Sequence, residues 1–148
     1  MTKRTAGFTL IELLVVTTII AVLAVGAVIS FTSAGKSARD GRRKSDLETV
    51  RQALVLYKSE NGAYPTGAFS AATTTLISDG FLSSPAPTDP KGTGSYTYSY
   101  ATSASAPYTT FCVCALMEGT GANSNAVANA TCSGIGGASP TYYCVKQP

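Results

Sequence analysis

One uncharged apolar segment near the N-terminus constrains this chain more than any other feature. Residues 13–35 contain no Asp, Glu, Lys or Arg, and residues 8–31 are dominated by Val, Ile, Leu and Ala without any Pro. As a helix, residues 13–35 would be about 35 Å long, which is enough to cross the hydrocarbon core of a bilayer. The segment therefore predicts a membrane-spanning helix.

Basic residues flank this segment on both sides. Lys3 and Arg4 precede it, so the positive-inside rule predicts a cytoplasmic N-terminus with the remainder of the chain outside. The residues that follow it argue the other way, because they are also basic: Lys36, Arg39, Arg42, Arg43 and Lys44. A basic flank on the translocated side needs an explanation other than topology.

Glu12 is a single acid near the start of the apolar segment. An unpaired carboxylate near the bilayer centre costs about 3 kcal/mol or more. Glu12 could lie at the interface and reach water, favoured there by the helix N-terminus. The other interpretation is a dedicated cationic partner, for which Lys3 and Arg4 are candidates while the chain is intact.

The residues around Glu12 resemble the processing signal of type IV pilins and type II secretion pseudopilins. The similarity lies in G-F-T-L-I-E at residues 7–12, after a short basic leader, and continues through E-L-L-V-V. It implies that a prepilin peptidase cleaves between Gly7 and Phe8 and methylates the new N-terminal Phe8. It also implies that Glu12 attracts the N-terminal ammonium of a neighbouring subunit during assembly. Both charges are costly alone in an apolar layer and are relieved by pairing.

The N-terminus has two other interpretations. A conventional secretory signal would be cleaved after its apolar region, and Thr32-Ser33-Ala34 is a passable site. However, the apolar run is longer than usual for such a signal, and Glu12 would interrupt it. A plain single-span anchor leaves Glu12 unexplained.

Residues 36–62 predict an amphipathic continuation of the same helix. Leu47, Val50, Leu54 and Tyr57 follow helical spacing, and Val55 and Leu56 widen this stripe. The opposite face is predicted to be charged, with Arg39, Arg42, Arg43, Asp46, Arg51 and Lys58. The basic run at residues 36–44 predicts a solvated face; the alternative is pairing with Asp40, Asp46 and Glu48 of neighbouring subunits.

The predicted helix ends at Asn61-Gly62, before Pro65. Residues 38–47 and the N-G-A-Y-P sequence at residues 61–65 also resemble the major pseudopilins. The P-x-D-P and Y-x-Y patterns that follow share this resemblance. The Asp-rich loop with which those proteins bind calcium has no counterpart here, so no calcium site is predicted.

Residues 63–148 predict a small β-rich head. A helical turn is expected at residues 76–82, a turn at residues 87–90, and strands at residues 96–100, 108–117 and 141–146. Three antiparallel strands would cover the Leu47 face of the helix. The predicted fold class is α+β: a long N-terminal helix packed on a small antiparallel sheet. Residues 1–7 form the leader, 8–35 the membrane helix, 36–62 the stem and 63–148 the head.

The head contains all four cysteines of the chain: Cys112, Cys114, Cys132 and Cys144. Their spacing has no C-x-x-C pair and is a poor zinc pattern, whereas an oxidising location favours two disulfides. A bond between Cys112 and Cys114 is discounted as a strained ring. Two pairings remain open: nested, with Cys112–Cys144 and Cys114–Cys132, or crossed, with Cys112–Cys132 and Cys114–Cys144.

The composition argues against catalysis. His is absent, and no nucleophile-elbow, phosphate-loop or zinc-protease motif occurs, so the chain is predicted to be no enzyme and to need no cofactor or metal. A net charge of +3 is too weak to indicate nucleic acid as the main partner.

The leading expectation is a subunit of an extracellular type IV pilus, serving adhesion, motility or DNA uptake. The alternative is a major pseudopilin of type II secretion, and a remoter one is a membrane-anchored binding protein. The resemblance implies these partners: copies of itself, prepilin peptidase, and an inner-membrane assembly platform with its ATPase. The precursor would lie in the cytoplasmic membrane with its head outside, and the assembled form in a surface pilus or periplasmic pseudopilus.

Overall fold

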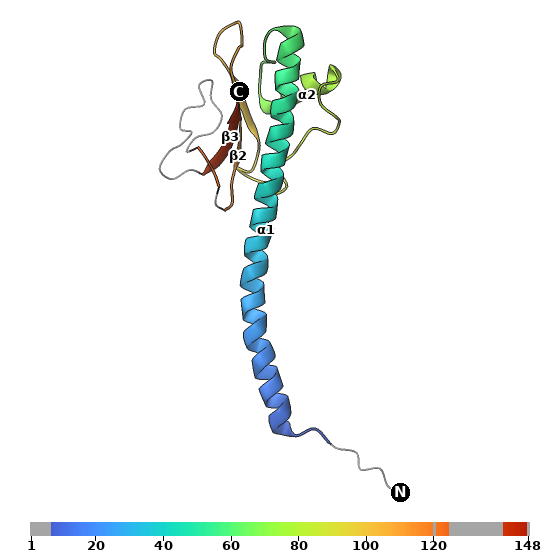
Figure 1. Cartoon of the computed structure of the whole chain (residues 1–148), viewed down its shortest axis with the longest axis vertical. Helices are drawn as coiled ribbons and strands as arrows, with labels where there is room; N and C mark the ends of the chain where they lie inside the picture. Colours follow the sequence, from blue (N-terminus) through green and yellow to red (C-terminus); the bar gives the residue numbers. More distant parts are fainter. Residues whose placement is uncertain (1–6, 120, 125–140, 148) are drawn as a thin grey trace. The chain divides into compact units, whose positions relative to one another are not determined.

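The computed structural model describes residues 7–119, 121–124 and 141–147. Its elements follow the order α1 (Leu10–Asn61), α2 (Phe69–Ser78), β1 (Ser99–Thr102), β2 (Phe111–Leu116) and β3 (Tyr142–Lys146) (Figure 1). The contacts within the chain divide it into two units, Met1–Gly35 and Lys36–Pro148. A long N-terminal helix and a three-stranded antiparallel sheet confirm the predicted α+β class.

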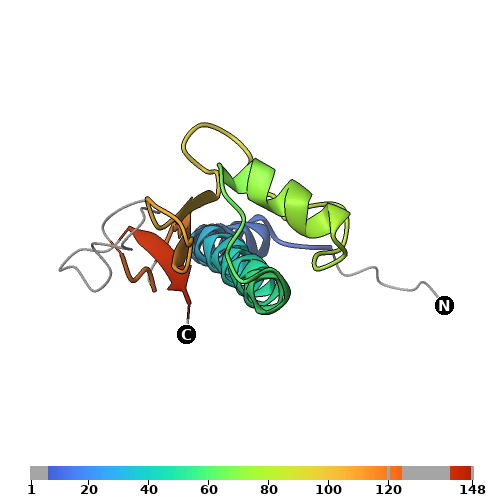
Figure 2. The same ribbon diagram turned by 90° about the horizontal axis from the view of Figure 1, so that it is seen from above.

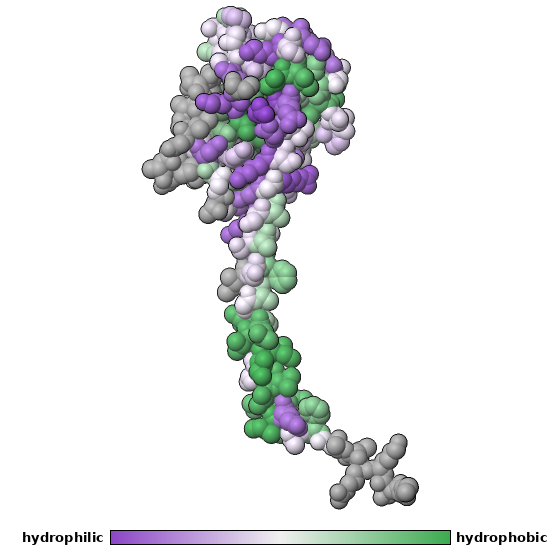
Figure 3. All heavy atoms as spheres, viewed as in Figure 1, coloured by the Kyte–Doolittle hydropathy of each residue, from purple (hydrophilic) through white to green (hydrophobic). Residues whose placement is uncertain are grey.

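In the first unit, the large apolar side chains of α1 that the structure describes are exposed. Phe8 is 81% exposed and Leu10 83% exposed, and the apolar window of α1 is entirely unburied. The helix is long and apolar enough to cross a membrane, and Figure 3 shows the apolar surface that its side chains form. An exposed apolar surface of this kind marks a membrane or protein contact.

In the second unit, α1 contributes one face to the core. Leu47, Val50 and Leu54 are fully buried, as the helical spacing predicts, and Tyr57 packs against the core while partly exposed. Leu56 was predicted to widen this stripe, but it points outward and is 56% exposed. The reason is geometric, since Leu56 lies about 200° around the helix from Leu54.

The end of α1 is where the sequence predicts it. The helix ends at Asn61, and Gly62 adopts a φ of 77°, a left-handed conformation that glycine adopts without a steric penalty. Its N–H donates to the carbonyl of Lys58 at 2.8 Å, which satisfies one of the last helix carbonyls. This is the expected glycine C-terminal cap.

The sheet has the order β1-β2-β3, with both pairs antiparallel. Phe111, Val113 and Ala115 point to the core that contains Leu47 and Leu54, whereas the alternate residues Cys112 and Cys114 point to the opposite face. The sheet and α2 lie on different sides of the C-terminal half of α1 (Figures 1 and 2). All three predicted strands are present, with shorter or shifted bounds.

Two tyrosines tie the start of β1 to neighbouring elements. The Tyr98 hydroxyl donates to the Asp46 carboxylate at 2.7 Å, and the Tyr100 hydroxyl donates to the Pro65 carbonyl at 2.6 Å. Both rings are buried, so each hydroxyl has the partner that a buried tyrosine needs. The alternation that predicted a strand at residues 96–100 thus marks the tyrosines that pack inward, while the strand itself begins at Ser99.

Helix α2 differs from the sequence prediction. The turn expected at residues 76–82 is the end of a ten-residue helix that begins at Phe69. The segment lacks a side-chain cap and contains three consecutive threonines, which have low helix propensity, so no start signal is visible in the sequence. Packing of Ala72, Thr73 and Leu76 into the core stabilises the helix instead.

A substitution pair on α1 tests this assignment of faces. Leu54→Ala should lower the free energy of unfolding of the second unit by about 2–5 kcal/mol, because it leaves a cavity in the core. Leu56→Ala, two residues away and exposed, should change it by no more than about 0.5 kcal/mol. Chemical unfolding of the full chain in detergent, followed by near-ultraviolet circular dichroism, measures both. Equal effects would contradict the assignment.

Candidate functional site

The start of α1 forms a capping box between Thr9 and Glu12. The Thr9 N–H and hydroxyl donate to Glu12 Oε2 at 2.9 and 2.7 Å, and the Glu12 N–H donates to the Thr9 hydroxyl at 3.3 Å. Two N–H groups that a helix N-terminus would otherwise leave unsatisfied are thus bonded reciprocally. The Glu12 carboxylate, which is costly in an apolar segment, therefore has a local role in capping its own helix.

This cap leaves half of the carboxylate available. Both bonds from Thr9 go to Oε2, and no described group donates to Oε1. Within residues 7–119, 121–124 and 141–147, no cation lies within ion-pair distance of Glu12. Lys3 and Arg4, the partners considered from the sequence, lie outside the described residues. Among the described residues, Glu12 Oε1 therefore accepts no hydrogen bond, and the side chains around it are apolar.

The predicted processing residues lie immediately before this cap. Gly7 has no neighbouring atom where a Cβ would lie, and Phe8 is exposed. An open, non-helical Gly7–Phe8 bond ahead of a capped helix is sterically accessible to a protease. Cleavage there and methylation of Phe8 remain predictions.

A second site, which the sequence did not predict, lies around Arg43 in the stem. Arg43 is fully buried and donates to Asp89 through two hydrogen bonds of 2.7 and 2.9 Å, and to Asp40 at 2.7 Å. Its Nη1 also lies 3.0 Å from Oε1 of Glu118. We call the six residues involved the Arg43 cluster: Arg39, Asp40, Arg43, Asp89, Lys91 and Glu118.

The cluster joins three segments that are distant in the sequence. Arg39 forms a bidentate ion pair with Glu118 at 2.7 and 2.8 Å. The Glu118 and Gly119 N–H groups donate to the Asp40 carboxylate at 3.0 and 2.8 Å, so Asp40 is bonded from both the stem and the residues after β2. Because breaking a buried pair leaves an uncompensated charge, these bonds specify where the head contacts the stem.

This finding corrects the prediction that residues 36–44 form a solvated face. Arg43 and Asp40 are buried, and their partners belong to the same chain. The alternative, pairing with Asp40, Asp46 and Glu48 of neighbouring subunits, is not needed for Arg39 and Arg43. The signal was present in the sequence, since Arg43 extends the buried Leu47, Val50 and Leu54 stripe by one helical turn.

The carboxylates of the cluster have lowered pKa values. Hydrogen bonds from Arg39, with a further contribution from Arg43, lower the pKa of Glu118 to about 2. Burial acts to raise the pKa of Asp89, but the hydrogen bonds from Arg43 and from the Lys91 N–H outweigh it, so this pKa is also lowered. Both acids are therefore ionised in the folded head at neutral pH. These are the acids beyond residue 88, and stem cations engage both of them.

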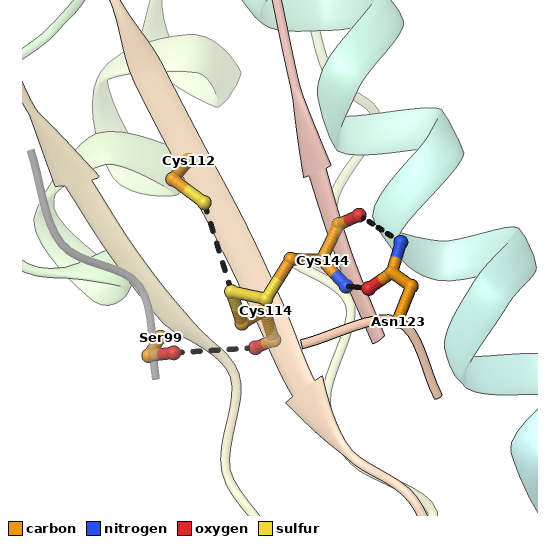
Figure 4. The surroundings of a disulfide bond; sticks show 5 residues. All are labelled: Ser99, Cys112, Cys114, Asn123 and Cys144. Atoms are coloured by element: carbon orange, nitrogen blue, oxygen red, sulfur yellow. Dashed lines mark hydrogen bonds between the residues drawn. A yellow bond between two sulfur atoms is a disulfide. The ribbon is translucent and has the colours of Figure 1, made fainter. Parts of the chain in front are cut away.

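A disulfide joins β2 and β3 on the sheet face opposite to the core. Cys114 is bonded to Cys144, and the two residues lie directly opposite each other in the β2–β3 register (Figure 4). The nested pairing, in which Cys144 bonds to Cys112, is therefore wrong. In the antiparallel register Cys112 faces Lys146, so Cys114 is the nearer cross-strand partner.

Cys112 is also disulfide-bonded. The crossed pairing assigns it to Cys132, which lies outside the described residues, so the second bridge stays a prediction. The sulfurs of Cys112, Cys114 and Cys144 lie within 4.8 Å of one another, but disulfide sulfurs are not the thiolates that a metal requires. Asn123 supports this region by hydrogen bonding both the N–H and the carbonyl of Cys144 (Figure 4).

Comparisons with known proteins support the interpretation of the N-terminal sequence as a processing and methylation motif. Residues 2–28 match the family model of the prokaryotic N-terminal methylation motif. The chain is 38% identical over 64 residues to the type II secretion system core protein G of Pseudomonas aeruginosa, and 36% identical over 64 residues to that of Aeromonas hydrophila. Each match covers 43% of this chain and 45% of the relative, so the chain spans under half the length of these relatives. The search of solved structures gave no significant match.

The Arg43 cluster predicts an acid-sensitive head. Because the pKa of Glu118 falls from an ordinary 4.5 to about 2 on folding, the stability it contributes is present above pH 4.5 and is lost as the pH falls to about 2. Asp89 acts in the same direction. We expect the free energy of unfolding to drop by about 2 kcal/mol or more over this range. Denaturant unfolding at a series of pH values measures it, and a profile without a decline would contradict the role of the cluster.

The disulfide assignment predicts a defined labelling pattern. Partial reduction and alkylation of the full chain, followed by tandem mass spectrometry, should label Cys114 and Cys144 as a pair. Cys144→Ser should then leave Cys114 as the reactive thiol of the sheet. Pairwise labelling of Cys112 with Cys144 would contradict the structure and support the nested pattern.

Proposed function

We propose that this chain, whose N-terminus is similar to the prokaryotic methylation motif and to type II secretion core proteins, is a prepilin-like filament subunit of the pseudopilin type. Its apolar helix holds the precursor in the membrane and later packs against the helices of other copies. Two features of the first unit support this proposal. The apolar surface of α1 is unburied within the chain, and Glu12 lies at its start.

Glu12 is the observation that carries the proposal. An acid in an apolar helix is costly unless it finds a partner, and a membrane anchor alone has no use for it. The capping box relieves part of the cost by bonding Oε2 to Thr9, while Oε1 remains without a described donor. A cation from a second copy can bind Oε1 without breaking the cap, so capping and pairing are compatible.

That cation, in this proposal, is the new N-terminal ammonium of a neighbouring subunit. Prepilin peptidase cleaves between Gly7 and Phe8, removes the 1–7 leader and methylates Phe8. The ammonium at Phe8 then lies in the same apolar layer as the Glu12 of the next copy. Pairing of the two charges in trans relieves both and sets the axial stagger between subunits.

The comparisons favour a pseudopilin over the pilus subunit that the sequence alone placed first. Both curated relatives are type II secretion core proteins, and they match over a segment longer than the methylation motif. The proposed assembly is a short periplasmic filament, built on an inner-membrane platform with its ATPase. A surface pilus serving adhesion, motility or DNA uptake is the second candidate, and the lack of an Asp-rich loop in the sequence after Asp89 favours it.

A structural subunit of this kind needs no catalytic centre. Pilins and pseudopilins are building blocks, and the buried charges of this head are engaged in ion pairs that join the stem to the head. We therefore propose that the protein is no enzyme and that its partners are copies of itself and the proteins of the assembly machinery.

Glu12→Gln tests the proposal. Glutamine can retain the capping box with Thr9 but carries no charge, so the substitution removes the ion pair and keeps the helix start. We expect normal membrane insertion and normal cleavage after Gly7, but no filament. Fractionation and N-terminal sequencing measure the first two steps, and chemical cross-linking of neighbouring copies in the cell envelope measures assembly.

Thr18→Val is the matched control, since the Thr18 hydroxyl bonds only the Val15 carbonyl of its own helix. It should leave assembly unchanged. Loss of protein export to the medium with Glu12→Gln, in cells whose surface pili are unaffected, identifies the filament as a secretion pseudopilus. Filaments formed normally by Glu12→Gln would refute pairing in trans.

A further inference from the structure

Strand β3 is an outer strand of the described sheet, and residues that follow β2 cover its outer side. Ser124 and Tyr142 exchange two backbone hydrogen bonds of 2.8 Å. Further along β3, the Cys144 N–H donates to the Asn123 side-chain oxygen at 2.6 Å, and the Asn123 side-chain nitrogen donates to the Cys144 carbonyl at 2.9 Å (Figure 4). The Asn123 side chain therefore takes the place of a peptide group of a further strand.

The groups that Asn123 binds are those with which a sheet edge pairs with another strand. In an antiparallel sheet, alternate residues of an outer strand direct their N–H and C=O groups to the neighbouring strand and to the outer side. Cys144 directs both groups to Asn123, so Val145, which faces Val113 in the register, directs its own to β2. Uncovered edges tend to pair with strands of other chains. Asn123 thus protects the β3 edge at Cys144.

The stem holds the other end of the stretch that contains Asn123. We call the described residues of this stretch, Glu118, Gly119 and 121–124, the edge segment. The Glu118 and Gly119 N–H groups donate to the Asp40 carboxylate at 3.0 and 2.8 Å. Arg39 binds the Glu118 side chain through two further hydrogen bonds of 2.7 and 2.8 Å. The stem thus fixes the edge segment at the end that is remote from β3.

The edge segment also passes close to the stem at Gly121. This residue has a φ of 96°, which glycine adopts without a steric penalty. A Cβ at this position would lie 2.8 Å from the Lys44 ammonium nitrogen, which in turn lies 5.1 Å from the centre of the Tyr143 ring of β3. The stem and β3 therefore contact the same short segment, the stem at its start and β3 at its end.

We propose that the edge segment is a guard of the β3 edge, held in place by the stem. Asn123 covers Cys144 only while the segment is fixed at Asp40 and Arg39. Loosening of these stem contacts therefore removes the cover that Asn123 places on the Cys144 backbone groups. The edge then pairs with a strand of a second copy through main-chain hydrogen bonds. The junction of stem and head thus controls the exposure of the sheet edge, a role separate from filament assembly through α1.

Amide hydrogen exchange of the full chain in detergent, resolved by nuclear magnetic resonance, tests this guard. Asn123→Ala removes both side-chain bonds, so the Cys144 amide should exchange about tenfold faster. Arg39→Ala acts at the remote stem end and should accelerate exchange of the same amide several-fold. The Val145 amide, which faces β2, should keep its exchange rate in both variants and so reports that the sheet remains folded.

Asn61→Ala and Glu48→Gln are the matched controls. The Asn61 side chain donates to the Tyr57 carbonyl of its own helix, and Glu48 forms its ion pair with Arg51. Neither substitution should change the exchange rate of the Cys144 amide. An unchanged Cys144 rate in Arg39→Ala, or equal acceleration of Cys144 and Val145, would overturn the inference.

Light scattering over a series of protein concentrations measures strand addition by a second copy. Asn123→Ala should associate as its concentration rises, whereas the wild type and Asn61→Ala should stay at one chain per micelle. Faster exchange of the Cys144 amide in Asn123→Ala without any association would show that Asn123 orders the edge but does not guard it, and the proposal would then be wrong.

Discussion

The head depends on one buried cation, Arg43, held by carboxylates from three segments. Asp40 comes from the helix itself, Asp89 from the loop before β1, and Glu118 from the residues after β2. A fully buried guanidinium is stable only when its donors are bonded, so the loops must be in place for the helix to pack. The apolar core around Leu47 and Leu54 supplies the hydrophobic stabilisation, whereas Arg43 specifies which loops contact it.

This arrangement also explains the basic flank that topology rules left unexplained. Arg39 and Arg43 supply charges that the head carboxylates neutralise, and Lys44 lies over the Tyr143 ring at 5.1 Å. The basic residues after the apolar segment are thus largely the stem side of an intramolecular junction.

Helix α1 has two parts of different composition, an apolar part up to Gly35 and an amphipathic part after it. Up to Gly35 its described large apolar side chains are exposed, and under the proposed function they contact a bilayer first and other helices later. Beyond that residue one face is buried by the head, and Leu56 on the other face is exposed.

Local patterns in the sequence determined the helix, its end at Asn61-Gly62, its buried Leu47–Leu54 stripe, the three strands and the N-terminal motif, because each depends on spacing or on a single residue type. Tertiary structure decided the rest. Whether Arg43 is solvated or buried depends on acids more than forty residues away, and helix α2 depends on packing that overrides threonine propensity. Which sulfur bonds Cys144 depends on the β2–β3 register, which sequence spacing alone does not specify.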